Sequence, residues 1–224
     1  MNAGGDVADR YRQLLLAIDV ELRACGRPAG SVVVVGIAKR QPVVALDDAI
    51  RAGLADLGEN YLQEARTKLP LLPPVRKHFV GHLQTNKAKA VTELFDVVQS
   101  VDRIEAGRAL ARAARAQGRR LPVLLQLNIS ATERFGCPPE EGERLAEELR
   151  AEGALDVQGL MAIGPATLDR DAISRAFDLA AKTFDRIGGN TLSIGMSGDW
   201  REAVRAGSTM VRLGTALFGG RDNA

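Results

Sequence analysis

Cysteine is nearly absent from this sequence, with only Cys25 and Cys137 among 224 residues. The two lie far apart, and neither belongs to a CxxC pair or to a spacing typical of a metal site. Their scarcity excludes a disulfide framework and is typical of a protein from a reducing compartment. We expect both thiols to be free and inert.

Long apolar runs are also missing. No segment approaches the roughly 20 apolar residues that a membrane span needs. The N-terminal stretch carries Asp6, Asp9, Arg10 and Arg12 and has no apolar run of signal-peptide length. We therefore expect a cytoplasmic protein that has no membrane partner.

Charge of one sign is not in excess, because 30 basic and 28 acidic side chains give a formal net charge of +2. Such a balance offers no strong field to nucleic acid, so any anion must be bound locally. One predicted helix does carry an arginine stripe that could touch RNA or phospholipid. We interpret it as the solvated outer face of that helix: Arg108, Arg112, Arg115 and Arg119.

Aromatic residues make up only 4% of the chain against 46% hydrophobic residues in total, so the core must be aliphatic. Eight segments rich in Val, Ile and Leu recur, and runs such as VVVV are typical of parallel strands covered on both faces. The predicted strands are residues 31–38, 55–58, 78–83, 95–101, 122–129, 157–163, 191–196 and 210–214. Their alternation with helical stretches predicts a (β/α)8 TIM barrel as a single domain over residues 1–224, with a doubly wound open sheet as the alternative.

Helix signals separate these strands. Predicted helices over residues 47–52, 102–117 and 139–151 each end before a glycine. The segments AIRAGLADLG at 49–58 and AVRAGSTMVRLG at 203–214 repeat one order of helix, glycine and strand. Residues 7–24 predict an extra N-terminal helix that closes the barrel bottom or packs alongside the barrel.

The loops after the last two predicted strands read GMSGD and RLGTALFGG. Barrels commonly hold phosphate in these loops, where free backbone N–H groups converge. Ser197 supplies a hydroxyl there, while Gly214 lets the backbone come close to a ligand. Asp199 and Glu202 have the spacing of a capping box for the following helix. Each loop alone could be a plain chain reversal, but the pair predicts a phosphate site.

Lys39 follows the apolar run VVVVGIA at the mouth of the predicted barrel. A lone lysine at a strand end is most often a solvent-exposed side chain. A lysine held away from water beside a phosphate site can instead attack a carbonyl as a neutral amine and form a Schiff base. This pairing indicates pyridoxal phosphate (PLP), and Arg212 fits a cation that faces its pyridine nitrogen and keeps that nitrogen unprotonated.

The motifs IAKRQP, LGENYLQE, HFVGHLQTNK, GLMAIGP, SIGMSGDW and STMVRLGTALFG resemble, in this order, the pyridoxal-phosphate homeostasis proteins. These are single-domain relatives of alanine racemase with a fold-type III barrel. The resemblance implies a PLP aldimine on Lys39 and phosphate contacts from Ser197 and from the backbone around Gly214 and Thr215. It also implies Arg212 near the pyridine nitrogen and Asn60 near the ring hydroxyl.

Two departures from the family pattern stand out. Ala38 lies where the family usually has serine, so a hydroxyl beside the lysine is missing. The loop after the fifth predicted strand, residues 131–139, is one residue shorter than usual and has Arg134 where lysine is common. The role of this loop stays open.

Two classes of function share such a site: a non-enzymatic PLP carrier and a PLP-dependent amino-acid racemase. Racemisation needs an acid or base on each face of the planar intermediate, the second usually a tyrosine from another domain. The chain ends soon after the last predicted strand, and its tyrosines are Tyr11, on the first helix, and Tyr61, which we expect to begin a helix and pack. We therefore expect a monomeric carrier that buffers PLP or delivers it to PLP-requiring apoenzymes.

Two histidines are the remaining candidates for chemistry. His78 and His82 lie four residues apart on a predicted strand, too far apart for an easily shared metal, and no third ligand is in view. We expect one histidine at the edge of the core, one in a loop, and no metal site.

Overall fold

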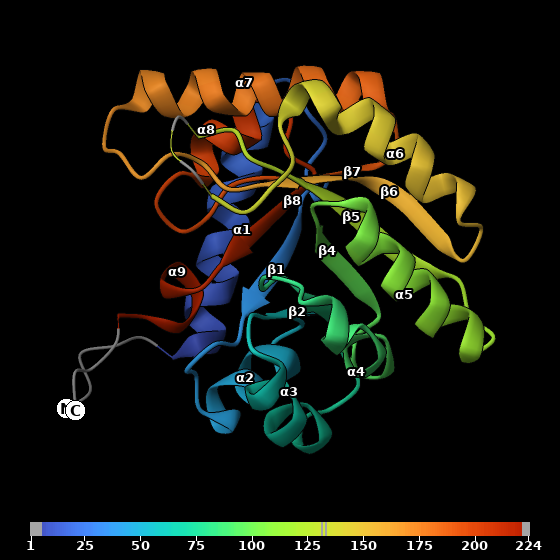
Figure 1. Ribbon diagram of the computed structural model, residues 1–224. Helices are drawn as coiled ribbons and strands as arrows, with labels where there is room; N and C mark the ends of the chain where they lie inside the picture. The colour runs from blue at the N-terminus through green and yellow to red at the C-terminus, as the bar shows by residue number, and fades with distance from the viewer. Residues whose placement is uncertain (1–5, 131, 133, 221–224) are drawn as a thin grey trace.

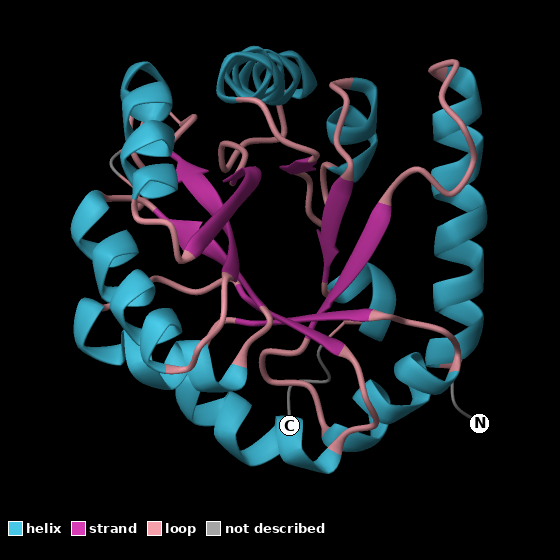
Figure 2. Ribbon diagram, turned by 90° about the vertical axis from the view of Figure 1, so that its right-hand side faces the viewer, coloured by secondary structure: helices cyan, strands magenta, loops and turns pink. Residues whose placement is uncertain are grey.

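The computed structural model describes residues 6–130, 132 and 134–220. Eight parallel strands form a closed barrel in chain order, with β8 paired to β1. Figure 2 shows the strands around a common interior and the helices outside them. The strands are β1 (Val33–Ile37), β2 (Asp56–Glu59), β3 (Arg76–Phe79), β4 (Val97–Val101), β5 (Leu121–Leu127), β6 (Leu155–Ala162), β7 (Thr191–Ser193) and β8 (Met210–Leu213). The predicted TIM barrel is confirmed, and the alternative of a doubly wound open sheet is wrong.

Helices connect and cover the strands (Figure 1). They are α1 (Val7–Ala24), α2 (Val43–Arg51), α3 (Leu62–Lys68), α4 (Ala88–Leu94), α5 (Ile104–Ala116), α6 (Gly142–Ala151), α7 (Arg170–Ile187), α8 (Trp200–Arg205) and α9 (Thr215–Phe218). Short 3-10 turns cover Leu69–Leu71, Thr85–Lys87 and Pro139–Glu141. The predicted helix over residues 139–151 thus begins as a 3-10 turn and continues as α6.

Two predicted strands extend at least three residues too far at their carboxyl ends. β3 stops at Phe79, because the chain turns past Gly81, where a side chain would collide with the carbonyl of Asn60. β7 stops at Ser193, because the chain turns at Gly195, which has a φ of 98°. In both cases the residues assigned to strand form loops at the mouth of the barrel, where function is expected.

The repeated helix–glycine–strand segments adopt the same geometry. Gly53 after α2 and Gly207 after α8 have φ values of 105° and 96°, a region that favours glycine. The next residue donates its N–H five positions back in each case, Leu54 to Ala49 at 3.0 Å and Ser208 to Ala203 at 2.9 Å. The prediction that one helix-to-strand solution is used twice is confirmed.

The N-terminal helix α1 packs alongside the barrel and does not close its bottom. It contacts α2, α8 and α9, and Figure 1 shows it beside β1 and β8. Because α9 is only four residues long, α1 supplies the cover that a full-length last helix would give. Its buried side chains repeat at helical spacing along one face: Val7, Tyr11, Leu14, Ile18 and Leu22.

Three arginines of the predicted stripe, Arg108, Arg112 and Arg115, lie exposed on α5, whereas Arg119 lies beyond the end of this helix and is partly buried. Arg108 and Arg115, both about half exposed, pair with Glu152. Arg119 donates to the carbonyl oxygen of Thr92 at 3.2 Å. Part of the stripe therefore has protein partners.

Neither cysteine forms a disulfide. Burial raises the pKa of Cys137 to about 12, so this thiol is protonated and unreactive at neutral pH. None of the described helices is long and apolar enough to cross a membrane.

Truncating Ile18 should test whether α1 is part of the core. Ile18 is 2% exposed, so Ile18→Ala should lower the free energy of unfolding by about 3 kcal/mol through lost burial and a residual cavity. Leu16 on the opposite face is 65% exposed, and Leu16→Ala should change the free energy of unfolding by less than about 0.5 kcal/mol. Urea unfolding measures both, and equal effects would contradict the packing of α1.

Candidate functional site at the mouth of the barrel

Lys39 lies in the turn that follows β1, two residues beyond the end of the strand. Helix α3 holds this turn from both sides of the lysine. Lys68 Nζ donates to the carbonyl oxygen of Ala38 at 3.2 Å, and Glu64 Oε2 accepts from the N–H of Arg40 at 2.9 Å. Arg40 has a φ of 59°, which is uncommon for a residue with a side chain. The backbone on each side of Lys39 is therefore fixed.

The two residues of α3 that hold this turn also pair with each other. Lys68 Nζ lies 2.5 Å from Glu64 Oε2, and both side chains are mostly buried. Burial alone would raise the pKa of Glu64, but hydrogen bonds from Lys68 and from the N–H of Arg40 outweigh it and lower that pKa. The sequence analysis missed this support, although the i, i+4 spacing of Glu64 and Lys68 on a helix could have indicated it.

Asn60 follows β2, beside β1 in the barrel. Glu59 shapes this turn, since its Oε1 accepts from the N–H groups of Asn60 at 2.7 Å and Tyr61 at 3.1 Å. The side-chain oxygen of Asn60 is buried, and no described residue donates to it. A residue whose backbone is held in place and whose side-chain oxygen is unused can serve a ligand at the mouth. The role of Glu59 was another feature missed from the sequence.

Glu59 itself is a buried carboxyl group with one unused oxygen. Its residue is 1% exposed, and Oε2 has no hydrogen-bond partner among the described residues. Burial raises the pKa of Glu59, and the N–H groups of Tyr61 and Asn60 oppose the shift only in part.

The loops after β7 and β8 meet at Ser197. Its Oγ accepts from the N–H of Gly214 at 3.2 Å and of Ala216 at 3.1 Å. Within the described part of the chain, no acceptor takes the N–H of Gly198 or Thr215. A methyl group at Gly198 would meet nothing within 4 Å, and one at Gly214 would meet only Ile37, at 3.8 Å. Free donors beside open space fit an oxyanion such as phosphate.

The predicted capping box of Asp199 and Glu202 is wrong. No side chain caps α8, because Asp199 Oδ1 accepts instead from the N–H of Met196 at 2.5 Å within the GMSGD turn. Glu202 pairs with Arg170 at 3.3 Å. Asp199 therefore shapes the loop that carries Ser197, and its burial raises its pKa.

Arg212 on β8 lies below the mouth and is 4% exposed. Its Nη1 donates to the carbonyl and hydroxyl oxygens of Ser193 at 2.6 and 2.7 Å, and its Nη2 donates to the carbonyl of Ala162 at 2.9 Å. Burial lowers the pKa of Arg212 to about 10, and the nearby charge of Asp199 opposes this shift. The guanidinium therefore stays charged at neutral pH.

The barrel gathers all six predicted site residues at one end of four successive strands. The order β7, β8, β1, β2 places the Ser197 loop, the Gly214 and Thr215 loop, Lys39 and Asn60 side by side. Arg212 pairs in register with Val35, and Gly36 with Leu213, so Arg212 lies deeper than the β1 turn. The arrangement can hold an oxyanion beside an amine, with a buried cation beneath.

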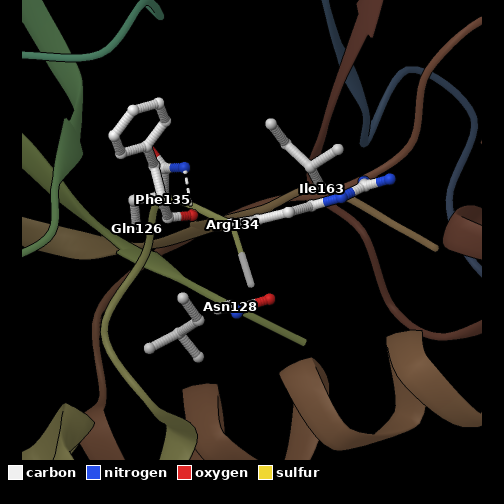
Figure 3. Close-up of a pocket in the computed structure, with 6 residues that line it drawn as sticks. Gln126, Asn128, Arg134, Phe135 and Ile163 are labelled. Carbon is white, nitrogen blue, oxygen red and sulfur yellow. Dashed lines mark hydrogen bonds between the residues drawn. The ribbon is translucent and has the colours of Figure 1, made fainter. Parts of the chain in front are cut away.

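Across the mouth, the loop after β5 borders a cavity of about 670 Å³ (Figure 3). Gln126 donates to the carbonyl of Phe135 at 2.8 Å, and Arg134 donates to that of Gly164 at 3.2 Å. Phe135 also stacks on His82, with ring centroids 3.7 Å apart. Arg134, which replaces the common lysine, therefore ties this loop to the end of β6. Ala131 and Glu133 of this loop lie outside the described residues.

One histidine lies in a loop as predicted, but the other lies inside the core and not at its edge. His78 is fully buried on β3, whereas His82 lies in the following loop. No group of three or more His, Cys, Asp and Glu side chains that could hold a metal occurs in the described residues.

Comparison with known proteins places this site in a class. The family model "Alanine racemase, N-terminal domain" matches residues 32–222. A protein of Pseudomonas aeruginosa named pyridoxal phosphate homeostasis protein is 39% identical over 96% of each chain. The chain thus belongs to the pyridoxal phosphate homeostasis protein family.

Two solved structures share the fold of this chain. An unknown protein from Bifidobacterium adolescentis superposes with a TM-score of 0.89 at 32% identity, covering 95% of this chain and 94% of that one. PipY of Synechococcus elongatus, with PLP bound, superposes with a TM-score of 0.77 at 32% identity, covering 90% of this chain and 100% of PipY.

Replacing Glu59 should change how stability depends on pH. The folded-state pKa of Glu59 lies above the ordinary value of about 4.3. The contribution of Glu59 to stability is therefore fully present below about pH 4.3 and is lost as the pH rises through the folded-state pKa. Glu59→Gln keeps the accepting oxygen and cannot ionise. Its free energy of unfolding should therefore fall less than that of the wild type from about pH 4 to about pH 7.

Urea unfolding at a series of pH values measures this difference. Glu93→Gln is the control, because the Glu93 side chain is 50% exposed. Parallel curves for wild type and Glu59→Gln would contradict the raised pKa.

Proposed function

We propose that this protein binds pyridoxal 5'-phosphate and serves in its homeostasis, holding the cofactor in reserve and not using it for catalysis. The observation that carries the proposal is the convergence of a fixed lysine turn and a pair of loops with free N–H donors on neighbouring strands. The relative from Pseudomonas aeruginosa is named for the same role, and PipY has been solved with PLP bound.

The residues at the mouth fit each part of PLP. Bound PLP supplies an aldehyde that condenses reversibly with an amine. Lys39 provides that amine at the end of β1. The phosphate fits the N–H donors of Gly198 and Thr215, together with the Ser197 hydroxyl and the open backbone at Gly214.

The two remaining predicted site residues, Asn60 and Arg212, fit the pyridine ring of PLP. Asn60 can bond the ring hydroxyl, since its buried amide oxygen has no partner among the described residues. Arg212, buried and charged below the mouth, would meet the ring as a pure donor. A cation there keeps the pyridine nitrogen unprotonated, which makes the ring a weak electron sink.

The same features favour a carrier over an amino-acid racemase. A racemase needs a second acid or base on the opposite face of the cofactor. Tyr11 is buried in α1, where its hydroxyl donates to the carbonyl of Gly53 at 3.4 Å. Tyr61 is half exposed at the start of α3, so it does not pack as expected. Neither tyrosine is held over Lys39 by a described contact.

The wider role forms part of the same proposal. We infer a single-domain, monomeric, cytoplasmic protein that buffers PLP or delivers it to PLP-requiring apoenzymes. The even charge balance is consistent with a small-molecule partner, since it gives no general attraction to polyanions.

Borohydride reduction should fix the cofactor on Lys39. The purified protein loaded with PLP should be yellow, and mass spectrometry after reduction should find the pyridoxyl adduct on the peptide that contains Lys39. Lys39→Ala should abolish the adduct and the visible band, because Lys39 is the lysine of the turn after β1 and the nearby amine of Lys68 is engaged by Glu64. Lys89→Ala is the matched control, since the Lys89 side chain is 83% exposed. An adduct confined to another lysine would refute the assignment.

The carrier and racemase roles can be separated with the loaded protein. We expect no sustained conversion of L-alanine to D-alanine, followed by chiral chromatography, because a second base is not held over the site. We also expect a PLP-requiring apoenzyme to regain activity when mixed with the loaded protein. Racemisation over many turnovers would overturn the carrier role, and Lys39→Ala tested in parallel reports any contaminating racemase.

A further inference from the structure

A chain of hydrogen-bonded side chains crosses the barrel interior beneath the proposed cofactor site. It joins residues of β8, β7, β4, β3 and β2. The distances are 2.7 Å from Arg212 Nη1 to Ser193 Oγ, 2.7 Å from Ser193 Oγ to Gln99 Oε1, 2.9 Å from Gln99 Nε2 to His78 Nδ1 and 2.8 Å from His78 Nε2 to Asp56 Oδ1. Strands β7 and β4 are not neighbours, so the bond between Ser193 and Gln99 spans the interior.

The two ends of the chain determine its direction. Arg212 has only donors, so the Ser193 hydroxyl accepts from it and must give its own proton to Gln99. The amide of Gln99 then presents its oxygen to Ser193 and its NH₂ group to His78. His78 accepts at Nδ1 and therefore donates from Nε2 to Asp56, which as a carboxylate only accepts. Every proton in the chain points from the cation toward the anion.

Burial makes this chain costly to break. His78, Gln99 and Ser193 are each 0% exposed, and the Asp56 side chain is 13% exposed. In such a place each bond polarises the next, and a donor or acceptor that loses its partner cannot turn to water. The second N–H of Gln99 reaches Met210 Sδ at 3.2 Å, which further fixes the amide.

We propose that Ser193, Gln99 and His78 are positioning residues for Arg212. The chain links the guanidinium, through side chains of β7, β4 and β3, to Asp56 on β2, and it would set the orientation of Arg212 beneath the cofactor ring. Ser193 accepts both bonds from Nη1 of Arg212, and Ala162 accepts one bond from Nη2. No described residue accepts from Nε. The chain thus selects which N–H of Arg212 is presented to a ligand. This inference rests on the proposed binding of PLP.

Ser193→Ala tests the chain at the bond next to Arg212. Loss of the hydroxyl removes one of the two acceptors of Nη1 and the donor to Gln99, so the guanidinium keeps its bonds to the Ser193 and Ala162 carbonyls but loses the link to Asp56 that sets its orientation. The dissociation constant for PLP should rise about tenfold, the worth of one hydrogen bond to a charged group. The ¹⁵N chemical shift of the pyridine nitrogen in labelled PLP should also move. Ser193→Thr, which keeps the hydroxyl, should restore both values.

Ser100→Ala is the matched control. Ser100 lies on β4 next to Gln99 and is 1% exposed, but its hydroxyl has no partner among the described residues. Removing it takes away a buried hydroxyl without breaking the chain, so both PLP measurements should match the wild type. If Ser193→Ala does not fold, Gln99→Met interrupts the chain one bond further away and should give the same changes.

The outcomes distinguish this inference from the proposed function. A wild type that binds PLP together with a Ser193→Ala variant of equal affinity and unchanged ¹⁵N shift overturns the positioning role alone. A lower melting temperature with both PLP measurements unchanged shows a purely structural chain and overturns it too. A wild type that takes up no PLP contradicts the proposed function, and it also contradicts the positioning role, which depends on PLP binding.

Discussion

A charged guanidinium inside the barrel is the constraint to which much of the site conforms. Removing such a charge from water is costly unless hydrogen bonds and an opposite charge compensate for it. No carboxylate of the described residues forms an ion pair with Arg212. The guanidinium relies on oxygens of Ser193 and Ala162 and on the more distant charge of Asp199. The cation is therefore compensated yet keeps donors for a ligand.

Three loops at the mouth of the barrel depend on residues outside the predicted site. Glu64 and Lys68 of α3 hold the backbone around Lys39, and Glu59 holds the turn of Asn60. Asp199 does the same for the loop of Ser197. In each case a partly or fully buried charged side chain fixes a loop at a strand end. The site is thus preorganised by its neighbours, which lowers the entropy lost when a ligand binds.

Sequence reasoning was reliable where a signal is local. The eight strands, the exact span of α1 and the repeated glycine turns all follow from apolar patterning and glycine positions. Strand ends at the mouth were less predictable, because β3 and β7 end where tertiary contacts force a turn. The capping box failed for the same reason, since Asp199 bonds a turn that no local pattern indicates. The interior chain could not be foreseen, as its members lie on five strands.

The pairing of β8 with β1 also has a consequence for biosynthesis. Lys39 leaves the ribosome early, whereas Ser197, Arg212 and the short α9 emerge near the end of synthesis. Until they do, β1 lacks one neighbour and α1 lacks its contacts with α8 and α9. Closing the barrel therefore requires contacts between residues far apart in sequence, which form slowly. A product that stops before Ser197 lacks both loops of the proposed phosphate site, so we expect that only the chain that has reached β8 and α9 could form the proposed pocket.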